Sequence, residues 1–332
     1  MKRKSNKKIL ICIADEIHIE GISILKNSGF AVVELYGLKN DSLINQIAGI
    51  EFAGNPVSAI IVRSVRNIGR DDILGIRKNT SVRLICTASS GFDNIDVSSS
   101  IKNGVVVLNV PDGNFVSAAE HTMAVILSII KNVSRADQDM KEGIFDAARY
   151  VNTELMGRTL GIIGVGRVGS YVAKLARAFQ MNVLGNDIKK SLIKKYPWIK
   201  FVKLEKLLRT SDIITIHTPL DSSTYDLINI DKVNLIPAGS ILINCARGGI
   251  VNETALAEAL KLRKLYYAGL DVFVNEPNIL SKLKGLDNII LTPHLAGKTT
   301  ESKVRISVQL ANRIVAHYKK LRFKSKNSTL KN

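Results

Sequence analysis

Short, nearly continuous apolar runs alternate with segments of helical spacing along this chain, and the alternation predicts an α/β protein. In its first part, five such runs read as strands: 9–14, 31–36, 59–63, 83–87 and 105–109. Strands that are apolar at successive positions are typical of parallel sheets covered on both faces. Helical spacing, for example at 17–27 and 71–78, fills the gaps between them. The pattern therefore predicts a doubly wound parallel sheet.

The same pattern begins again after a turn at 111–114 and predicts a second unit. Its strand-like runs are 159–163, 181–186, 213–217, 240–244, 267–270 and 289–292. Six strands with helices between them fit a complete dinucleotide-binding domain. A last helical stretch, 299–318, lies beyond the sixth strand and is expected to return to the first unit. We therefore expect one domain from 1–110 plus 299–332, and another from 111–298.

One predicted helix, from Ser117 to about Lys131, has an unusual surface. Ser117 and Glu120 have the spacing of a capping box, which would start the helix at Ser117. The residues that follow, such as Met123 and Ile126, are apolar nearly all round. A helix without a polar face is buried, either in a core or in a subunit interface.

The composition and the start of the sequence bear on whether the protein is inserted in a membrane or secreted. Hydrophobic residues make up 46% of the chain, but no apolar run approaches the roughly 20 residues needed to cross a bilayer, so no membrane span is expected. The basic start, residues 1–8, precedes an apolar run that stops at Asp15 and Glu16 without a cleavage pattern. This favours a solvated tail entering a strand over a signal peptide.

Three cysteines, Cys12, Cys86 and Cys245, lie in or beside apolar strand-like runs. An odd number in such positions favours buried, reduced thiols and a cytoplasmic location. Cys–His spacing typical of a metal site is absent from the sequence, so no metal is expected.

The net charge of +18 raises the hypothesis of nucleic-acid binding. Residues 1–8 carry five Lys or Arg, and residues 319–332 carry six, in both cases without an acid. Most of the surplus therefore lies near the two ends, with no aromatic-interleaved RNA motif or zinc finger beside it. We interpret the charge as favouring solubility and steering of an anionic substrate. Nucleic-acid binding by the two basic tails remains the alternative.

A glycine-rich turn, GVGRVG at 164–169, follows one strand and opens a helix. Gly164 permits a tight turn, Gly166 lets the backbone approach a pyrophosphate, and Gly169 allows close packing of helix on strand. The N-terminus of the helix that this turn opens presents free N–H groups to the anion. Asp187, after the next strand, is placed to accept hydrogen bonds from the adenosine ribose, which favours NAD over NADP.

Three further polar residues follow later strands: Arg247, Glu276 and His294. Taken singly, each has a structural explanation, as a strand-end ion pair, a solvated loop acid or a turn histidine. After a dinucleotide-binding turn, and each at the carboxyl end of a strand, they converge on one crevice. A guanidinium, a carboxylate and an imidazole beside a dinucleotide are the groups that hydride transfer on a 2-hydroxy acid requires.

Longer motifs carry a family resemblance. The strings HTPL (217–220), NCARGGIV (244–251), DVFVNEP (271–277) and TPHLAG (292–297), together with the glycine turn, resemble the D-isomer-specific 2-hydroxyacid dehydrogenases. The resemblance covers nearly the whole chain. It implies a Rossmann NAD-binding domain, 111–298, inserted into a flavodoxin-like substrate-binding domain, and pairing of two Rossmann domains in a homodimer. The apolar helix after Ser117 would then belong to that interface.

The resemblance also implies roles for particular residues. His294 would take the hydroxyl proton as hydride leaves C2, Glu276 would orient the imidazole, and Arg247 would hold the substrate carboxylate. Backbone N–H groups at Ser90 and Gly91 would help to hold that carboxylate. The cofactor would be contacted by residues of the glycine turn and of the strand ends: Gly164, Gly166, Arg167, Val168, Gly169, Asp187, His217, Thr218, Pro219, Cys245, Ala246, Asp271 (at the nicotinamide carboxamide), His294 and Gly297.

Two segments, SSGFDNID (89–96) and NVPDGNFVSAAEHT (109–122), most resemble the branch of the family that oxidises D-3-phosphoglycerate to 3-phosphohydroxypyruvate in serine biosynthesis. Arg63 and Asn114 match substrate-contacting positions of that branch, and Arg149 is a further candidate. Residues 143–152 depart from it, because several relatives carry Trp and more cations there. The chain ends at Asn332, so a regulatory domain that senses serine is not expected.

Two alternatives remain open. The first is a reductase of glyoxylate or hydroxypyruvate, or another D-2-hydroxyacid dehydrogenase. The second, of another class, is an NAD-sensing binding protein, since the family includes transcriptional corepressors that retain Arg247, Glu276 and His294. The absence of a long disordered extension disfavours it.

Overall fold

Successive residues of the first strand, β1 (Leu10–Ile13), face two different apolar layers. We describe a computed structural model that covers residues 8–36 and 42–329. Ile11 and Ile13 pack in one core, whereas Leu10 and Cys12 pack in the other, on the opposite face of the sheet. Because both faces are apolar, each must be covered by helices, as in a doubly wound fold.

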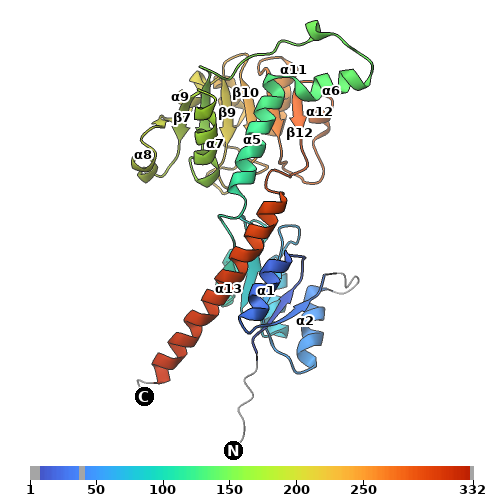
Figure 1. Cartoon of the computed structure of the whole chain (residues 1–332), viewed down its shortest axis with the longest axis vertical. Coiled ribbons are helices and arrows are strands. Elements are labelled where there is room, and N and C mark those ends of the chain that lie inside the picture. The colour runs from blue at the N-terminus through green and yellow to red at the C-terminus, as the bar shows by residue number, and fades with distance from the viewer. Residues whose placement is uncertain (1–7, 37–41, 330–332) are drawn as a thin grey trace, which may run out of the picture. The chain divides into compact units, whose positions relative to one another are not determined.

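The described residues form two compact units. The first unit comprises residues up to Asn114 together with those from Thr299 on, and the second unit comprises Phe115–Lys298. Each has its own parallel sheet (Figure 1).

The sheet of the first unit has the strand order β2-β1-β3-β4-β5, which is the flavodoxin-like order. All its strand pairs are parallel. Its strands after β1 are β2 (Ala31–Glu34), β3 (Val57–Val62), β4 (Leu84–Thr87) and β5 (Val106–Leu108). Its helices are α1 (Ile19–Asn27), α2 (Leu43–Phe52), α3 (Arg70–Asn79), α4 (Val97–Lys102) and α13 (Thr300–Thr329).

The last helix, α13, packs against the first, α1, on one face of this sheet (Figure 1). The two backbones approach closely at Gly21, where a Cβ atom would lie 2.6 Å from the carbonyl oxygen of Ser307. The hydroxyl of Ser307 accepts the N–H of His18 at 2.8 Å. Leu310 and Ile314 are fully buried in the same core as Ile22 of α1, so α13 completes the first unit.

The sheet of the second unit has seven parallel strands in the order β12-β11-β10-β9-β6-β7-β8. Six of them correspond to the predicted runs, and the seventh, β8, has only two residues at the sheet edge and was not predicted. The strands are β6 (Thr159–Ile163), β7 (Asn182–Asn186), β8 (Lys200–Phe201), β9 (Ile213–Ile216), β10 (Ile241–Asn244), β11 (Tyr267–Leu270) and β12 (Ile289–Leu291).

Helices cover both faces of this sheet as well. On one face, α5 and α7 lie side by side (Figure 1) and share a core with alternate strand residues such as Leu160 and Ile162. The neighbouring residue Ile163 belongs to the core of the opposite face. The helices are α5 (Phe115–Ile130), α6 (Val133–Lys141), η1 (Ala147–Arg149, a 3₁₀ turn), α7 (Arg167–Ala178), α8 (Ser191–Lys195), α9 (Leu204–Thr210), α10 (Ile230–Leu235), α11 (Glu253–Lys261) and α12 (Ser281–Lys284).

The predicted start of α5 at Ser117 is wrong. The helix begins at Phe115, and Ser117 is buried within its first turn. Phe115 makes an edge-to-face contact with Tyr171 of α7, with ring centroids 5.6 Å apart. The helix therefore starts two residues earlier than the capping box predicts, and its first side chain is packed against α7.

The fold-class prediction of two doubly wound parallel-sheet domains is confirmed. Within the described ranges, no helix is long and apolar enough to cross a membrane. All three cysteines are free thiols. Because every strand of the second unit runs the same way, the loops that follow them meet at one edge of its sheet, where ligands bind in such folds.

Candidate active site

The turn between β6 and α7 depends on its glycines. Gly164 has φ +88°, and a Cβ there would lie 2.8 Å from the backbone of His217. A Cβ at Gly169 would overlap the carbonyl oxygen of Gly164. Larger residues would therefore open the turn and push α7 away from the strand.

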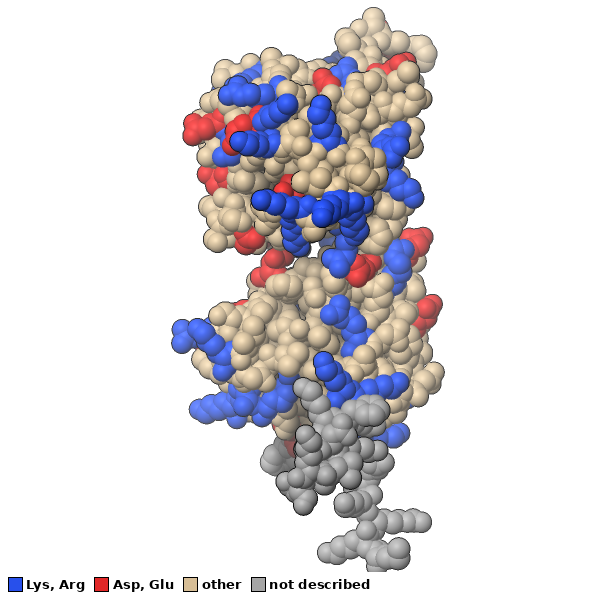
Figure 2. All heavy atoms as spheres, turned by 90° about the vertical axis from the view of Figure 1, so that its left-hand side faces the viewer, with Lys and Arg blue, Asp and Glu red and all other residues tan. Residues whose placement is uncertain are grey.

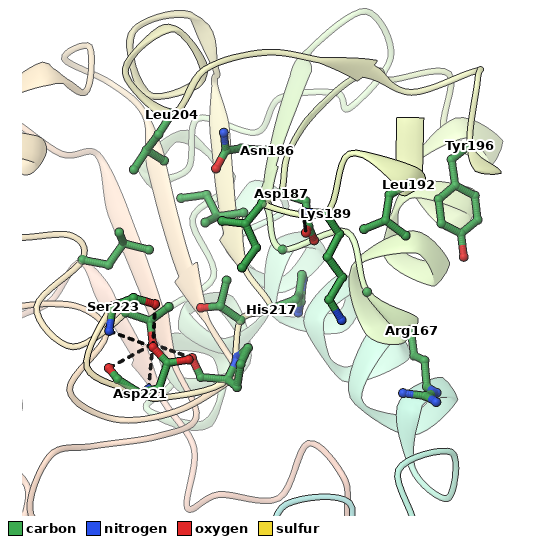
Figure 3. Close-up of a pocket in the computed structure, with 18 of the residues that line it drawn as sticks. Arg167, Asn186, Asp187, Lys189, Leu192, Tyr196, Leu204, His217, Asp221 and Ser223 are labelled. Carbon is green, nitrogen blue, oxygen red and sulfur yellow. Dashed lines mark hydrogen bonds between the residues drawn. The ribbon is translucent and has the colours of Figure 1, made fainter. Parts of the chain in front are cut away.

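Gly166 differs, because a Cβ there would meet no protein atom within 4 Å. It faces a cavity of about 610 Å³ at the carboxyl ends of the strands (Figure 3). The space beside Gly166 at the start of α7 is what a pyrophosphate needs in order to reach the helix N-terminus. Of the predicted cofactor residues, those that line the cavity are Gly164, Gly166, Arg167, Asp187, His217, Thr218 and Pro219.

Asp187 lies at the carboxyl end of β7, beside Lys189 (Figure 3). Its Oδ2 accepts the N–H of Val165 at 2.8 Å, and its Oδ1 accepts the N–H of Lys189 at 2.8 Å. The carboxylate is thus fixed by the glycine turn itself, and a second lone pair on each oxygen can accept a ribose hydroxyl. Its negative charge opposes a 2′-phosphate.

His217 and Thr218 also line the cavity, directly against Gly164 of the glycine turn. The Thr218 hydroxyl is buried and has no hydrogen-bond partner among the described residues. This hydroxyl can therefore form a hydrogen bond with a ligand in the cavity. Nε2 of His217 lies 3.0 Å from the hydroxyl of Thr215, and burial lowers the His217 pKa to about 3, so the ring is neutral. The open space at Gly166, the fixed acid and the unpaired hydroxyl fit a dinucleotide.

The face of the second unit that carries α8 and α9 is rich in Lys and Arg (Figure 2). Residues 189–209 contain eight Lys or Arg and one acid, Glu205, and all eight are exposed. Lys189 and Lys195 line the cavity. The charge of this face is complementary to that of an anionic dinucleotide. Its cations are Lys189, Lys190, Lys194, Lys195, Lys200, Lys203, Lys206 and Arg209.

Further along the same sheet edge, Nδ1 of His294 lies 2.7 Å from Oε2 of Glu276. The other carboxylate oxygen, Oε1, accepts the N–H of Phe273 at 3.0 Å. Because a carboxylate only accepts, the imidazole proton lies on Nδ1, and Nε2 keeps its lone pair. The His294 side chain is 47% exposed, so that nitrogen can reach a ligand.

Arg247 lies on the turn after β10, which packs against the loop that carries Glu276. Asn244 fixes this turn, since its amide donates to the carbonyl of Arg247 at 2.9 Å and its Oδ1 accepts the N–H of Ala246 at 3.0 Å. At Gly248, a Cβ would overlap the carbonyl of Phe273. The close contact places Arg247 on the loop next to the His294–Glu276 pair.

The remaining predicted cofactor residues of the second unit do not line the 610 Å³ cavity. Val168 and Gly169 lie in the first turn of α7, while Cys245 and Ala246 follow β10, and Asp271 follows β11. Burial and the charge of Asp271 raise the pKa of Cys245 to about 12, so this residue is a thiol. His294 and Gly297 follow β12. The predicted cofactor residues thus lie at two places along one sheet edge, as the two halves of an extended dinucleotide require.

Asp271 is fully buried, and its two oxygens accept donors from the turn that carries His294. Its predicted contact with a nicotinamide carboxamide stays a prediction. The structure shows a different task, which is to hold the turn at 292–296.

In the first unit, Arg63 follows β3 on a loop that two other side chains fix. The carboxylate of Asp15 accepts the N–H of Arg63 at 2.8 Å and pairs with the guanidinium of Arg66 at 2.8 Å. The amide of Asn94 donates to the carbonyls of both arginines. Within residues 8–36 and 42–329, the Arg63 guanidinium has no hydrogen-bond or ion-pair partner, so it is available to an anion.

The loop after β4 in the first unit presents two backbone donors. In the described part of the chain, neither the N–H of Ser90 nor that of Gly91 has an acceptor. Their carbonyls are engaged, by the amide of Asn109 and the hydroxyl of Ser89 respectively. Asn114 is the last residue of this stretch, directly before α5.

Arg149, by contrast, is paired. Its guanidinium lies 3.2 Å from a carboxylate oxygen of Asp139, which also accepts the hydroxyl of Tyr150 at 2.7 Å. This weakens its candidacy as a phosphate ligand.

The sequence did not reveal several residues that shape these sites. Asp15 and Asn94 fix the Arg63 loop through contacts between distant segments, which no local motif announces. His121, within α5, lies beside Asp271 and Thr292. The sequence signal for His121 was a single imidazole in a mostly apolar helix. No group of three His, Cys, Asp or Glu that could hold a metal occurs among the residues that the structure describes.

Comparison with known proteins agrees with this arrangement. Residues 123–296 match the family described as D-isomer specific 2-hydroxyacid dehydrogenase, NAD binding domain. The chain is 36% identical over 308 residues to a D-3-phosphoglycerate dehydrogenase of Archaeoglobus fulgidus; the match takes in 92% of this chain and 56% of that protein. The chain therefore spans little more than half the length of that relative.

Two further proteins are matched over nearly their whole length. A hydroxypyruvate reductase of Thermotoga maritima is 35% identical over 305 residues, which are 91% of this chain and 96% of that protein. A D-lactate dehydrogenase of Aquifex aeolicus, solved with NAD and lactic acid, has a TM-score of 0.78 at 29% identity, covering 93% of this chain and 95% of that one. The fold, the cavity at the glycine turn and the His294–Glu276 pair are those of a dinucleotide-dependent dehydrogenase. Within it, this chain belongs to the D-isomer-specific 2-hydroxyacid dehydrogenase family, and residues 123–296 are its NAD-binding domain.

Proposed function

We propose that this protein catalyses NAD-dependent oxidation of a D-2-hydroxy acid at the edge of the second sheet. The 2.7 Å contact between His294 Nδ1 and Glu276 Oε2 carries the proposal, because it leaves Nε2 as the proton acceptor. When bound, NAD supplies the acceptor for the hydride that leaves C2 of the substrate.

The side chains of this chain perform the proton transfer and the binding. Nε2 of His294 takes the C2 hydroxyl proton, and Glu276 holds the ring and stabilises the imidazolium that forms. Arg247 binds the substrate carboxylate with its planar guanidinium, a geometry that Lys does not offer. In the reverse direction the same imidazolium returns the proton to the C2 oxygen.

For the substrate we propose D-3-phosphoglycerate, which would be converted to 3-phosphohydroxypyruvate at the start of serine biosynthesis. The unpartnered guanidinium of Arg63 supports a phosphate ligand, and the N–H groups of Ser90 and Gly91 support a carboxylate. Asn114 would add a polar contact to the substrate. D-3-phosphoglycerate dehydrogenases are also prominent among the similar proteins.

The test is the initial rate of change in NADH absorbance. In the oxidative direction the protein is given 3-phosphoglycerate with NAD, and in the reductive direction it is given phosphohydroxypyruvate, hydroxypyruvate or glyoxylate with NADH. We expect preference for the phosphorylated pair. Arg63→Ala should raise KM for phosphohydroxypyruvate far more than KM for hydroxypyruvate. Lys78→Ala, which removes a cation from the end of α3, is the matched control. Equal effects of Arg63→Ala on both substrates would refute the phosphate assignment.

A reductase of hydroxypyruvate or glyoxylate is the second candidate. The Arg149–Asp139 pair favours it, because that pairing removes one of the cations expected at a phosphate. The hydroxypyruvate reductase from T. maritima is similar over nearly its full length. Turnover restricted to the unphosphorylated acids would select this function while leaving the proposed chemistry unchanged.

We further propose that the protein is a homodimer in the cytoplasm. The segment after α5 exposes large apolar side chains, including Phe145 at 89%, Val151 at 75% and Met156 at 64%. Solvation of such groups is unfavourable, and a second copy of the chain would bury them. The three free thiols suit a reducing compartment. Light scattering should give twice the mass of one chain, and Phe145→Asp should shift it toward the monomer.

A further inference from the structure

Three side chains from separate elements meet behind the turn that carries His294. His121 comes from α5, Asp271 follows β11, and Thr292 follows β12. Nε2 of His121 lies 3.2 Å from the hydroxyl of Thr292 and 3.7 Å from Oδ1 of Asp271. The hydroxyl of Thr292 lies 2.6 Å from the same Oδ1. The three groups therefore form one connected chain of polar contacts.

The direction of these hydrogen bonds follows from Asp271. Its Oδ1 accepts the N–H of Leu295 at 2.9 Å, and its Oδ2 accepts the N–H of Ala296 at 2.8 Å. Since both oxygens act as acceptors, the hydroxyl of Thr292 donates to Oδ1. The Thr292 oxygen is then left to accept, and the N–H at Nε2 of His121 is its donor.

The same contacts determine the position of His294. Its backbone has φ +49°, a left-handed conformation that is uncommon for a residue with a side chain. Its N–H is fixed by the carbonyl of Asp271 at 2.9 Å, and the two residues after it are fixed by the Asp271 carboxylate. The orientation of the imidazole thus depends on a buried carboxylate.

His121 gives this carboxylate a rigid support. Its side chain is 16% exposed, and Asp271 is fully buried, so solvent contributes little to the network. Neighbouring residues of α5, such as Met123 and Ile126, are packed in the core. A donor on a packed helix restrains Thr292, and through it Asp271 and the turn, more tightly than water could.

We propose that His121 is a positioning residue: through Thr292 and Asp271 it holds the turn that presents the His294 imidazole to the substrate. This inference rests on the proposed dehydrogenase function as far as catalysis is concerned. The positioning itself is a property of the protein without substrate or cofactor, and it can be measured separately.

The first measurement is the proton NMR resonance of the N–H at Nδ1 of His294, assigned by its loss in His294→Ala. His121→Leu removes the donor, and Thr292→Val removes the hydroxyl without changing its shape. His121→Gln and Thr292→Ser are the matched controls, because each retains a hydrogen-bonding group at the same place. We expect the resonance to persist in the wild type and both controls, and to broaden or vanish in the Leu and Val variants.

The second measurement is kinetic. His121→Leu and Thr292→Val should each lower kcat at least tenfold, whereas the Kd for NADH changes less than twofold. The double variant should be no slower than the slower single variant, because both changes break one chain of contacts. His121→Gln should recover most of kcat.

Specific results would overturn the proposal. An unchanged His294 resonance in His121→Leu and Thr292→Val would show that the turn keeps its conformation without these two side chains. Additive losses of kcat in the double variant would show that His121 does not act through Thr292. Equal losses of kcat in His121→Leu and His121→Gln would show that its hydrogen bond is not what matters. A fall in kcat matched by a fall in Tm would show a merely structural role. If the wild type oxidises no 2-hydroxy acid and reduces no 2-oxo acid, the proposed function fails, and the NMR result still decides the positioning role.

Discussion

The carboxyl group of Glu276 bonds to two partners at once: Oε2 lies 2.7 Å from Nδ1 of His294, and Oε1 accepts the N–H of Phe273 at 3.0 Å. The second contact fixes the carboxylate to its own loop, so the ring of His294 is oriented by backbone as well as by side chain. Both residues lie at the carboxyl edge of the second sheet, where the loops after β11 and β12 meet.

Loss of the imidazole should remove proton transfer without unfolding the protein. We expect His294→Ala to lower kcat about 10²- to 10⁴-fold, the usual contribution of a positioned acid or base. Glu276→Gln should cost less than Glu276→Ala, because the amide can still accept the Nδ1 proton. Steady-state kinetics checks this order, and NADH binding by the two Glu276 variants should match the wild type. Full activity of His294→Ala would contradict the assigned role.

The contact between Gly248 and Phe273 gives a test of loop packing. In Gly248→Ala, the new methyl group would overlap the Phe273 carbonyl and separate the Arg247 turn from the Glu276 loop. We expect a destabilisation of about 1–3 kcal/mol, as for other overpacked sites, together with a large fall in kcat. Thermal melting and kinetics measure the two effects.

Gly49→Ala is the control for that substitution. Gly49 lies within α2, and a Cβ there meets no atom within 4 Å, so alanine should stabilise the helix by about 0.5–1 kcal/mol. If Gly248→Ala melted at the wild-type temperature, the close packing of the two loops would be disproved.

Substitution of Gly166 should weaken cofactor binding without lowering the stability of the protein. A Cβ at Gly166 faces open space, so Gly166→Ala should fold normally yet obstruct the pyrophosphate. We expect the Kd for NADH to rise about tenfold, or about 1.4 kcal/mol, with an unchanged Tm. Gly169→Ala should instead lower Tm, since its methyl group would overlap the Gly164 carbonyl. Fluorescence titration with NADH gives the Kd, and an unaltered value for Gly166→Ala would argue against the pyrophosphate site.

His217 should make stability depend on pH. Burial lowers its pKa from 6.5 to about 3, so between these values the unfolded chain binds a proton that the folded protein does not. Its contribution to stability is therefore complete above pH 6.5 and is lost as the pH falls toward 3. The Tm difference between pH 7.5 and pH 5.0 should be smaller in His217→Gln than in the wild type. An equal difference in the two proteins would mean that the ring can be protonated in the folded state.

Most strands could be predicted because their apolar runs are four or more residues long, which makes them distinct from the helices around them. The two-residue strand β8 could not, since it pairs only with Leu184 and Gly185 at the sheet edge and has no period of its own. The start of α5 differs from the prediction, and its first residue, Phe115, contacts Tyr171, which is far away in sequence and which a local capping motif does not take into account.

The candidate site likewise contains residues that the sequence predicts and supporting contacts that it does not. Gly164, Glu276 and His294 belong to motifs that follow strands, so their convergence could be expected from the topology of a parallel sheet. The supporting contacts could not, because they join segments distant in sequence, as Asp15 joins Arg66 and His121 joins Thr292. Such contacts depend on the angle at which packed elements cross, and a local pattern does not specify that angle.

The packing of α13 on α1 also bears on synthesis of the protein. The first unit begins with β1, yet the helix that covers Ile22 and Leu25 is made only after the whole second unit, 115–298, has been translated. At about 5–20 residues per second, this leaves an apolar face uncovered for roughly 10–40 seconds. The second unit has no such delay, because all its strands and helices are contiguous in sequence. On the ribosome, the nucleotide-binding half can therefore fold before the half that precedes it, and the early half is the one that would need a chaperone.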